Sequence, residues 1–172
     1  MHRYITPSAL EVPPHEELDD MSRADLVFYD VEHSGPSYEG RVFINNPDAS
    51  EETALDLEEG YAGSFTVFGH AGCYGDDESH CHPRAGYRDE FDHRLPPPLV
   101  PFTKTVIVTE GLQRAGSSEI TVTVVPIVPE VEGGTEPKDV MKFGSLRLLI
   151  YEDPGQDSTT GAERSPRTRS AR

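Results

Sequence analysis

Short runs of alternating apolar and polar residues, each ended by a turn signal, constrain the fold of this chain more than any other feature. The runs cover residues 25–33, 39–45, 63–70, 103–109, 119–128 and 142–152. Side chains at every second position of a strand share one face, so this period of two predicts half-buried strands. Only residues 110–115 could form a helical turn or two. Six strands with almost no helix predict an all-β fold, an antiparallel β-sandwich of immunoglobulin-like or jelly-roll-like type.

The chain of 172 residues is expected to form one domain. Residues 1–23 contain three prolines and a cluster of acids, and we predict a flexible N-terminal arm there. Apolar residues are concentrated between Leu26 and Tyr151, which places the β-sandwich domain at 24–152. Within it, Phe65 and Val67 share one strand face and are expected in the core. Residues 153–172 are rich in Ser, Thr, Gly and Arg and are predicted to be a disordered basic tail.

A formal charge of −16 argues against nucleic-acid binding, because neutralising phosphates needs clustered Lys and Arg. No stretch is long and apolar enough to predict a membrane span. Residues 1–21 lack the apolar segment of a signal peptide. We therefore expect either a cytoplasmic protein or one exported together with a partner. The acidic segment 48–60 is interpreted as a solvated face, with weak cation binding as the alternative.

A long loop between the third and fourth predicted strands contains both cysteines. The candidate metal ligands lie within thirteen residues of one another: His70, Cys73, His80, Cys81 and His82. Thiolates and imidazoles together suit Cu(I) or Zn²⁺. A Cys73–Cys81 disulfide in an oxidising compartment and a pair of free thiols are equally compatible with the sequence. No recognised spacing decides between the three.

Four segments occur in an order that is typical of one protein family. They are Arg41–Asn46, Tyr61–Phe65 with its Ala-Gly-Ser-Phe sequence, Thr105–Leu112, and Val122–Pro126. In this order they resemble strands of the C-terminal β-domain of plant polyphenol oxidases, which belong to the tyrosinase family of type-3 copper proteins. The Lys-Phe-Asp-Val sequence that often begins this domain is not present literally. The Cys/His loop is not part of the plant pattern.

The resemblance implies a domain that packs on a copper-containing core and covers the entrance to its active site. A dicopper centre like that of the family needs six histidines on a four-helix bundle. This sequence has no pair of histidines at i, i+4 spacing. We therefore expect no catalytic residue and no enzyme activity in this chain. The expected role is a non-catalytic accessory or shielding domain or subunit of a tyrosinase-like oxidase (catechol oxidase or polyphenol oxidase), with copper in the partner.

Two other functions are compatible with the same residues. One is a stand-alone copper- or zinc-binding or delivery protein that uses His70, Cys73, His80, Cys81 and His82. The other is a β-sandwich interaction module whose likeness to oxidase domains is limited to the fold.

Overall fold

The computed structural model describes residues 3–13, 21–69, 100–129, 140–152 and 167–170. No helix in these ranges is long and apolar enough to cross a membrane. The strands and the helix, in chain order, are β1 (Tyr4–Ile5), β2 (Leu10–Glu11), β3 (Met21–Val31), β4 (Tyr38–Ile44), β5 (Tyr61–Val67), β6 (Phe102–Ile107), α2 (Thr109–Ala115), β7 (Glu119–Ile120), β8 (Val122–Ile127), β9 (Ser145–Glu152) and β10 (Arg167–Ser170).

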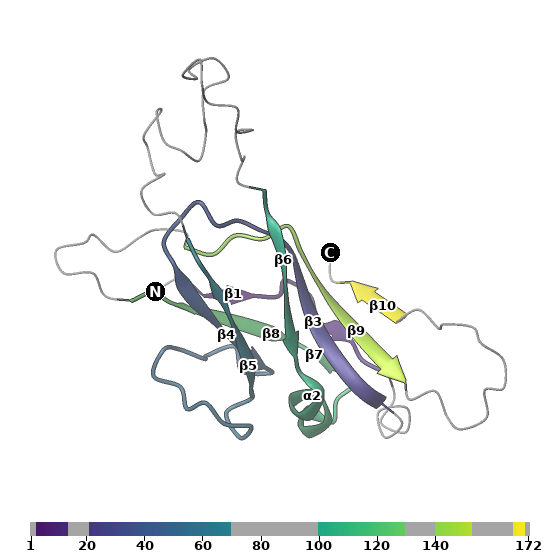
Figure 1. Ribbon diagram of the computed structural model, residues 1–172. Helices are drawn as coiled ribbons and strands as arrows, with labels where there is room; N and C mark the ends of the chain where they lie inside the picture. Colours follow the sequence, from purple (N-terminus) through teal and green to yellow (C-terminus); the bar gives the residue numbers. More distant parts are fainter. Residues whose placement is uncertain (1–2, 14–20, 70–99, 130–139, 153–166, 171–172) are drawn as a thin grey trace, which may run out of the picture.

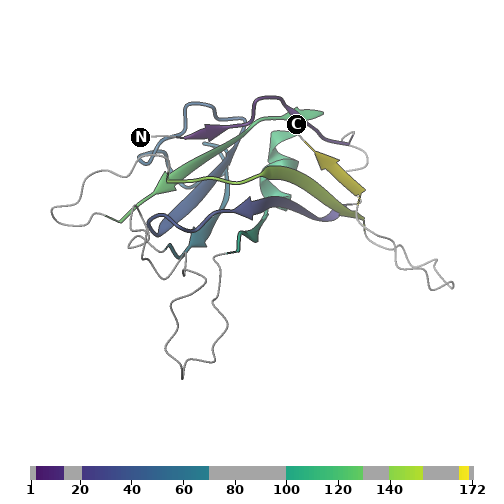
Figure 2. The same ribbon diagram turned by 90° about the horizontal axis from the view of Figure 1, so that it is seen from above.

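Two four-stranded antiparallel sheets face each other, which confirms the predicted β-sandwich. Their strand orders are β1-β8-β4-β5 and β10-β9-β3-β6, and β2 pairs with β7 in a separate ribbon. The two layers are visible from two directions in Figures 1 and 2. The run predicted at 119–128 is divided into β7 and β8. The division falls at Thr121, whose backbone is hydrogen-bonded to Asn45 at the end of β4.

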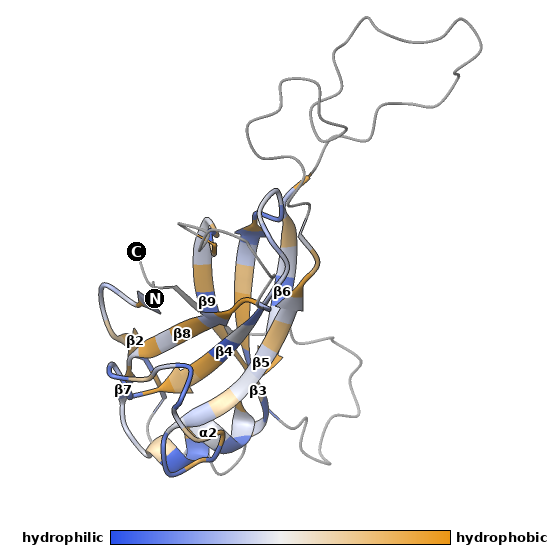
Figure 3. Cartoon of the chain, turned by 90° about the vertical axis from the view of Figure 1, so that its left-hand side faces the viewer, coloured by the Kyte–Doolittle hydropathy of each residue, from blue (hydrophilic) through white to orange (hydrophobic). Residues whose placement is uncertain are grey.

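The core lies between the sheets and is built from alternate residues of each strand. Figure 3 shows the resulting bands of hydrophobic and hydrophilic residues along β3 and β9. On β5, Phe65 and Val67 are buried and Ser64 and Thr66 are exposed, as the sequence predicts. The other strands contribute further apolar residues to the same cluster. They are Leu26 and Phe28 of β3, Val42 of β4, Val122 and Val124 of β8, and Leu146, Leu148 and Ile150 of β9.

The prediction of a flexible arm at 1–23 is wrong for the part that the structure describes. Tyr4 and Ile5 pair with β8, and Thr6 Oγ1 accepts a hydrogen bond from the Val122 N–H at 3.0 Å. Leu10 and Val12 are buried in the core, and β3 begins at Met21 rather than at residue 25. The prolines mislead here because Pro7 and Pro13 lie beside the short strands and remove no ladder hydrogen bond from them.

The C-terminal tail also differs from its prediction, because Arg167–Ser170 form β10 along the edge of β9. Figure 1 shows β10 in yellow beside β9. These four residues have almost no apolar surface, so composition predicted disorder. The backbone of β9 supplies hydrogen-bonding partners that composition does not reveal.

Candidate functional site

The five candidate metal ligands, His70, Cys73, His80, Cys81 and His82, lie in segment 70–99, outside the described residues. The metal-site, disulfide and free-thiol hypotheses therefore stay predictions. In the part of the chain that the structure describes, no three or more His, Cys, Asp or Glu side chains gather closely enough to hold a metal ion. This includes the acidic segment 48–60, so weak cation binding there has no ligand set to support it.

Both flanks of segment 70–99 are fixed against the chain between β3 and β4. On the N-terminal side, the Gly69 N–H donates to Ser37 Oγ at 3.0 Å. On the C-terminal side, His33 Nε2 lies 3.1 Å from the carbonyl oxygen of Val100, and its ring packs on Phe102 with 4.7 Å between centroids. His33 therefore has a structural role at this end of the sandwich.

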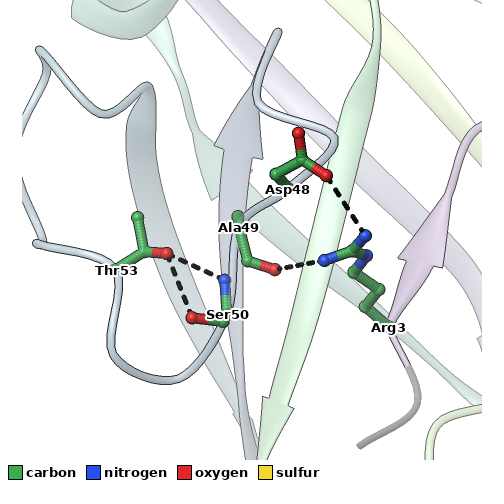
Figure 4. A network of polar contacts seen from close by, with 5 residues as sticks. All are labelled: Arg3, Asp48, Ala49, Ser50 and Thr53. Carbon is green, nitrogen blue, oxygen red and sulfur yellow. Dashed lines mark hydrogen bonds and ion pairs between the residues drawn. The ribbon is translucent and has the colours of Figure 1, made fainter.

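The acidic segment 48–60 is held against the sandwich by two arginines. Arg3 Nη1 donates to the carbonyl oxygen of Ala49 at 3.3 Å, and its Nη2 lies 3.5 Å from Asp48 Oδ1 (Figure 4). Arg41, on β4, donates from Nη1 to the carbonyl oxygen of Glu51 at 3.2 Å. Within the loop, the Ser50 N–H donates to Thr53 Oγ1 at 2.8 Å. The loop thus has a defined conformation as well as a solvated face.

The Asn45-Asn46 turn fixes the two ends of this loop. Asn45 has a left-handed backbone with φ of 56°, a conformation that asparagine tolerates better than most residues. Its N–H donates to the Thr121 carbonyl, and its Oδ1 accepts from the Thr121 N–H, both at 2.9 Å. Asn46 Nδ2 donates to the Glu59 carbonyl at 2.7 Å. The two asparagines therefore connect β4, the acidic loop and the start of β8.

Two leucines are exposed on this ordered loop. Leu55 and Leu57 are 48% and 40% exposed, and the acids Glu51, Glu52, Asp56, Glu58 and Glu59 occupy positions around them in the sequence. Figure 1 shows the loop between β4 and β5 at the same end of the sandwich as α2. A fixed loop with apolar and acidic side chains is suited to contact with a protein surface.

The segments with the family-like sequences pack against one another around α2. A methyl group added at Gly63 would lie 2.7 Å from Cγ1 of Val106, so β5 and β6 approach as closely as only glycine allows. One added at Gly111 would lie 2.9 Å from Cβ of Ala62. On the other side of β5, β4 pairs with β5 and with β8. The small residues of the Ala-Gly-Ser-Phe sequence thus have a packing role.

Sequence reasoning missed a second apolar cluster, on the outer face of the sheet that contains β4 and β8. Phe43, Ala49 and Val125 are buried there, with Tyr61 and Ile127 packed against them. The acidic loop contributes Ala49 and so covers part of this face. The signal was the run 124–128, which contains no polar side chain, since a run without alternation is typical of a strand buried on both faces.

Two buried hydroxyl groups, those of Tyr38 and Thr123, have no hydrogen-bond partner among the described residues. Tyr38 is 3% exposed, and its ring lies 6.2 Å from that of Phe65. Its hydroxyl group makes no hydrogen bond with the part of the chain that the structure describes, and burial raises the pKa of Tyr38 to about 12. A buried polar group without a partner loses its hydration and gains nothing in exchange.

Tyr38→Phe is therefore expected to raise the free energy of unfolding by about 1–3 kcal/mol at neutral pH, measured by urea denaturation. Unfolded Tyr38 releases its proton near its ordinary pKa of 10.0, whereas folded Tyr38 keeps it until about pH 12. The contribution of the raised Tyr38 pKa to the free energy of unfolding of the wild type is therefore fully present below pH 10. It is lost as the pH rises through 12. The variant should lose less stability over that interval. An unchanged or lower stability at pH 7 would mean that the hydroxyl has a partner in solution.

No protein-family model and no curated protein matches this chain. Among solved structures, recombinantly expressed latent aurone synthase, a polyphenol oxidase, is similar at 20% identity with a TM-score of 0.46, over 88% of this chain and 24% of that chain. The same protein from its natural source is similar at 19% identity with a TM-score of 0.45, over 87% and 24%. The chain spans about a quarter of the length of these structures. These are likenesses to part of a polyphenol oxidase, and this chain itself is an antiparallel β-sandwich.

Proposed function

We propose that this chain is a non-catalytic accessory domain or subunit that shields the active site of a tyrosinase-like type-3 copper oxidase. The observation that carries the proposal is the packing of the four family-like segments. Gly63 against Val106 and Gly111 against Ala62 give the Ala-Gly-Ser-Phe sequence a specific structural role, in contact with the strand and helix that also resemble the family. The four segments therefore belong to one packed unit of this chain, which supports the proposal more strongly than four separate short strand sequences would.

In this proposal the copper ions and the oxidation chemistry belong to the partner. The sandwich acts through its surface: it occupies the substrate entrance and must be displaced before a phenol enters. The surface that we expect to face the partner is the acidic loop, because Arg3, Arg41 and Asn46 hold it in one conformation. A loop that is already ordered loses less conformational entropy when it binds.

The purified chain is expected not to oxidise catechol or tyrosine, even after incubation with copper. Added in excess to an active dicopper oxidase core from the same source, it should lower the rate of catechol oxidation by about tenfold, which corresponds to roughly 1.4 kcal/mol of shielding. Limited proteolysis or mild detergent should restore the rate. Catechol oxidation by the isolated chain would contradict the proposal, and activation of a copper-free core without inhibition would favour copper delivery instead.

The double variant Leu55→Ser/Leu57→Ser should raise the concentration needed for half-maximal inhibition about tenfold or more, since burying one leucine side chain is worth roughly 1.5–3 kcal/mol. Its melting temperature should stay close to that of the wild type, because both side chains are exposed. Ile107→Ser is the matched control, since Ile107 is 57% exposed but lies on β6. Equal inhibition by the wild type and the loop variant would place the contact elsewhere on the domain.

A further inference from the structure

The edge of β9 is covered by a strand from the chain's own C-terminus. β9 pairs with β3 along one side, from Glu152 opposite Met21 to Ser145 opposite Tyr29. Along the other side, β10 pairs antiparallel with Arg147–Ile150, and Thr168 stands opposite Leu149. β10 is the outermost strand of its sheet, as Figures 1 and 2 show. Its place at the edge means that it can leave without breaking any other strand pairing in the described sheets.

The sequence of β10 gives it little affinity for this place beyond its backbone hydrogen bonds. Arg167–Ser170 contain no apolar residue. Residues 153–166, which connect β9 to β10, include two prolines and two glycines. Closing a connection of this length opposes the pairing entropically. A backbone hydrogen bond contributes only about 0.5–1.5 kcal/mol net, so a few of them hold β10 weakly.

The β9 edge, by contrast, is an effective template for a strand. Leu146, Leu148 and Ile150 fix β9 in the core, so its backbone groups stay in position when β10 leaves. A fixed edge with unpaired N–H and C=O groups binds extended peptides by adding a strand to the sheet. The other edges offer less: β1 has only two residues, and β5 and β6 lie against each other.

The surroundings of this edge favour a basic strand. β10 lies beside β2, where Glu11 stands opposite Glu119 of β7. The last twenty residues carry a net charge of +1, which leaves −17 on residues 1–152. An extended segment with arginines is therefore attracted to the acidic domain as a whole, and an acidic segment is repelled, although β9 itself carries Arg147 opposite Ser170.

We propose that the β9 edge is a binding site for extended, arginine-containing peptide strands, which β10 occupies in the same molecule. β10 then acts as a competitor that a second strand of the same chemistry replaces. The site is separate from the acidic loop, and the proposal does not depend on the proposed accessory function.

The test uses the full chain with Thr168→Pro/Arg169→Pro. N–H groups of neighbouring residues point to opposite sides of a strand, so two adjacent prolines remove whichever one β9 accepts. The probe is a fluorescein-labelled peptide of residues 165–172. The variant should bind it at least about tenfold more tightly than the wild type, where the tethered strand competes at an effective concentration of roughly millimolar. Thr159→Pro/Thr160→Pro, outside β10, is the matched control and should bind the peptide as weakly as the wild type.

Hydrogen exchange locates the site independently of affinity. The amides of Arg147–Ile150 that are protected in the wild type should exchange faster in Thr168→Pro/Arg169→Pro, and added peptide should restore their protection. Two peptides of the same charge serve as controls. One is N-methylated on every odd-numbered backbone nitrogen and the other on every even-numbered one, and one of the two should fail to bind. Equal binding of both methylated peptides at 0.15 M salt would show attraction by charge alone and overturn the proposal. Unchanged exchange at Arg147–Ile150 in the variant would also overturn it.

Discussion

Phe65→Ala is expected to lower the free energy of unfolding by about 3–5 kcal/mol, the usual range for a buried phenylalanine truncated to alanine. The Phe65 side chain is 6% exposed and lies between the sheets. Its ring packs on that of Phe28 with 4.8 Å between centroids. On the neighbouring strand it covers Gly40, where an added methyl group would lie 2.6 Å from Cζ of Phe65. Truncation therefore leaves a cavity that glycine cannot fill from the other side.

Urea denaturation followed by circular dichroism measures this loss. Thr66→Ala is the matched control on the same strand, because Thr66 is exposed on the opposite face. Its effect should stay within about 0.5 kcal/mol, as for most surface substitutions. A loss below about 1 kcal/mol in Phe65→Ala would mean that β5 pairs in another register in solution, since a shift of one residue exchanges the two faces of a strand.

Gly63→Ala is expected to lower the free energy of unfolding by about 2–5 kcal/mol, through two separate effects. Gly63 has φ of 141°, a backbone conformation that costs other residues roughly 1–3 kcal/mol. The added methyl group would also lie 2.7 Å from Cγ1 of Val106, and crowding of this kind in a packed core costs about 1–3 kcal/mol. The side chain of Val106 is buried, which limits how far it can move away.

Gly116→Ala separates the two effects experimentally. Gly116 also has a positive φ, of 55°, but the nearest atom to an added methyl group is the Arg114 carbonyl oxygen at 4.0 Å. Its replacement should therefore cost only about 1–2 kcal/mol, the penalty for a left-handed alanine. Val106→Ala in the Gly63→Ala background should recover part of the loss, because it removes the atom that is crowded. No recovery would attribute the whole effect to the backbone of residue 63.

The local pattern of the sequence was sufficient to predict the sandwich and its main strands. The alternation of Phe65 and Val67 with Ser64 and Thr66 determines which face of β5 is buried, because successive side chains of a strand point in opposite directions. The same period predicted β3, β4, β6 and β9 to within a few residues. The helical turn expected at 110–115 is α2, which Gly116 ends with a left-handed conformation.

Pairings between residues far apart in the chain were decided by the tertiary structure alone. Segment 3–13 reads as a linker, yet Tyr4 and Ile5 form strand β1 because β8 presents an edge to them. Segment 48–60 reads as solvated, yet Arg3, which precedes β1, and Arg41, on β4, fix two of its carbonyl oxygens. The composition of a segment indicates how much apolar surface it can bury, and the period of its apolar residues indicates which face is buried. Neither reports which backbone edge or side chain arrives from elsewhere in the chain, so these segments acquired their structure only from neighbours that the fold brings to them.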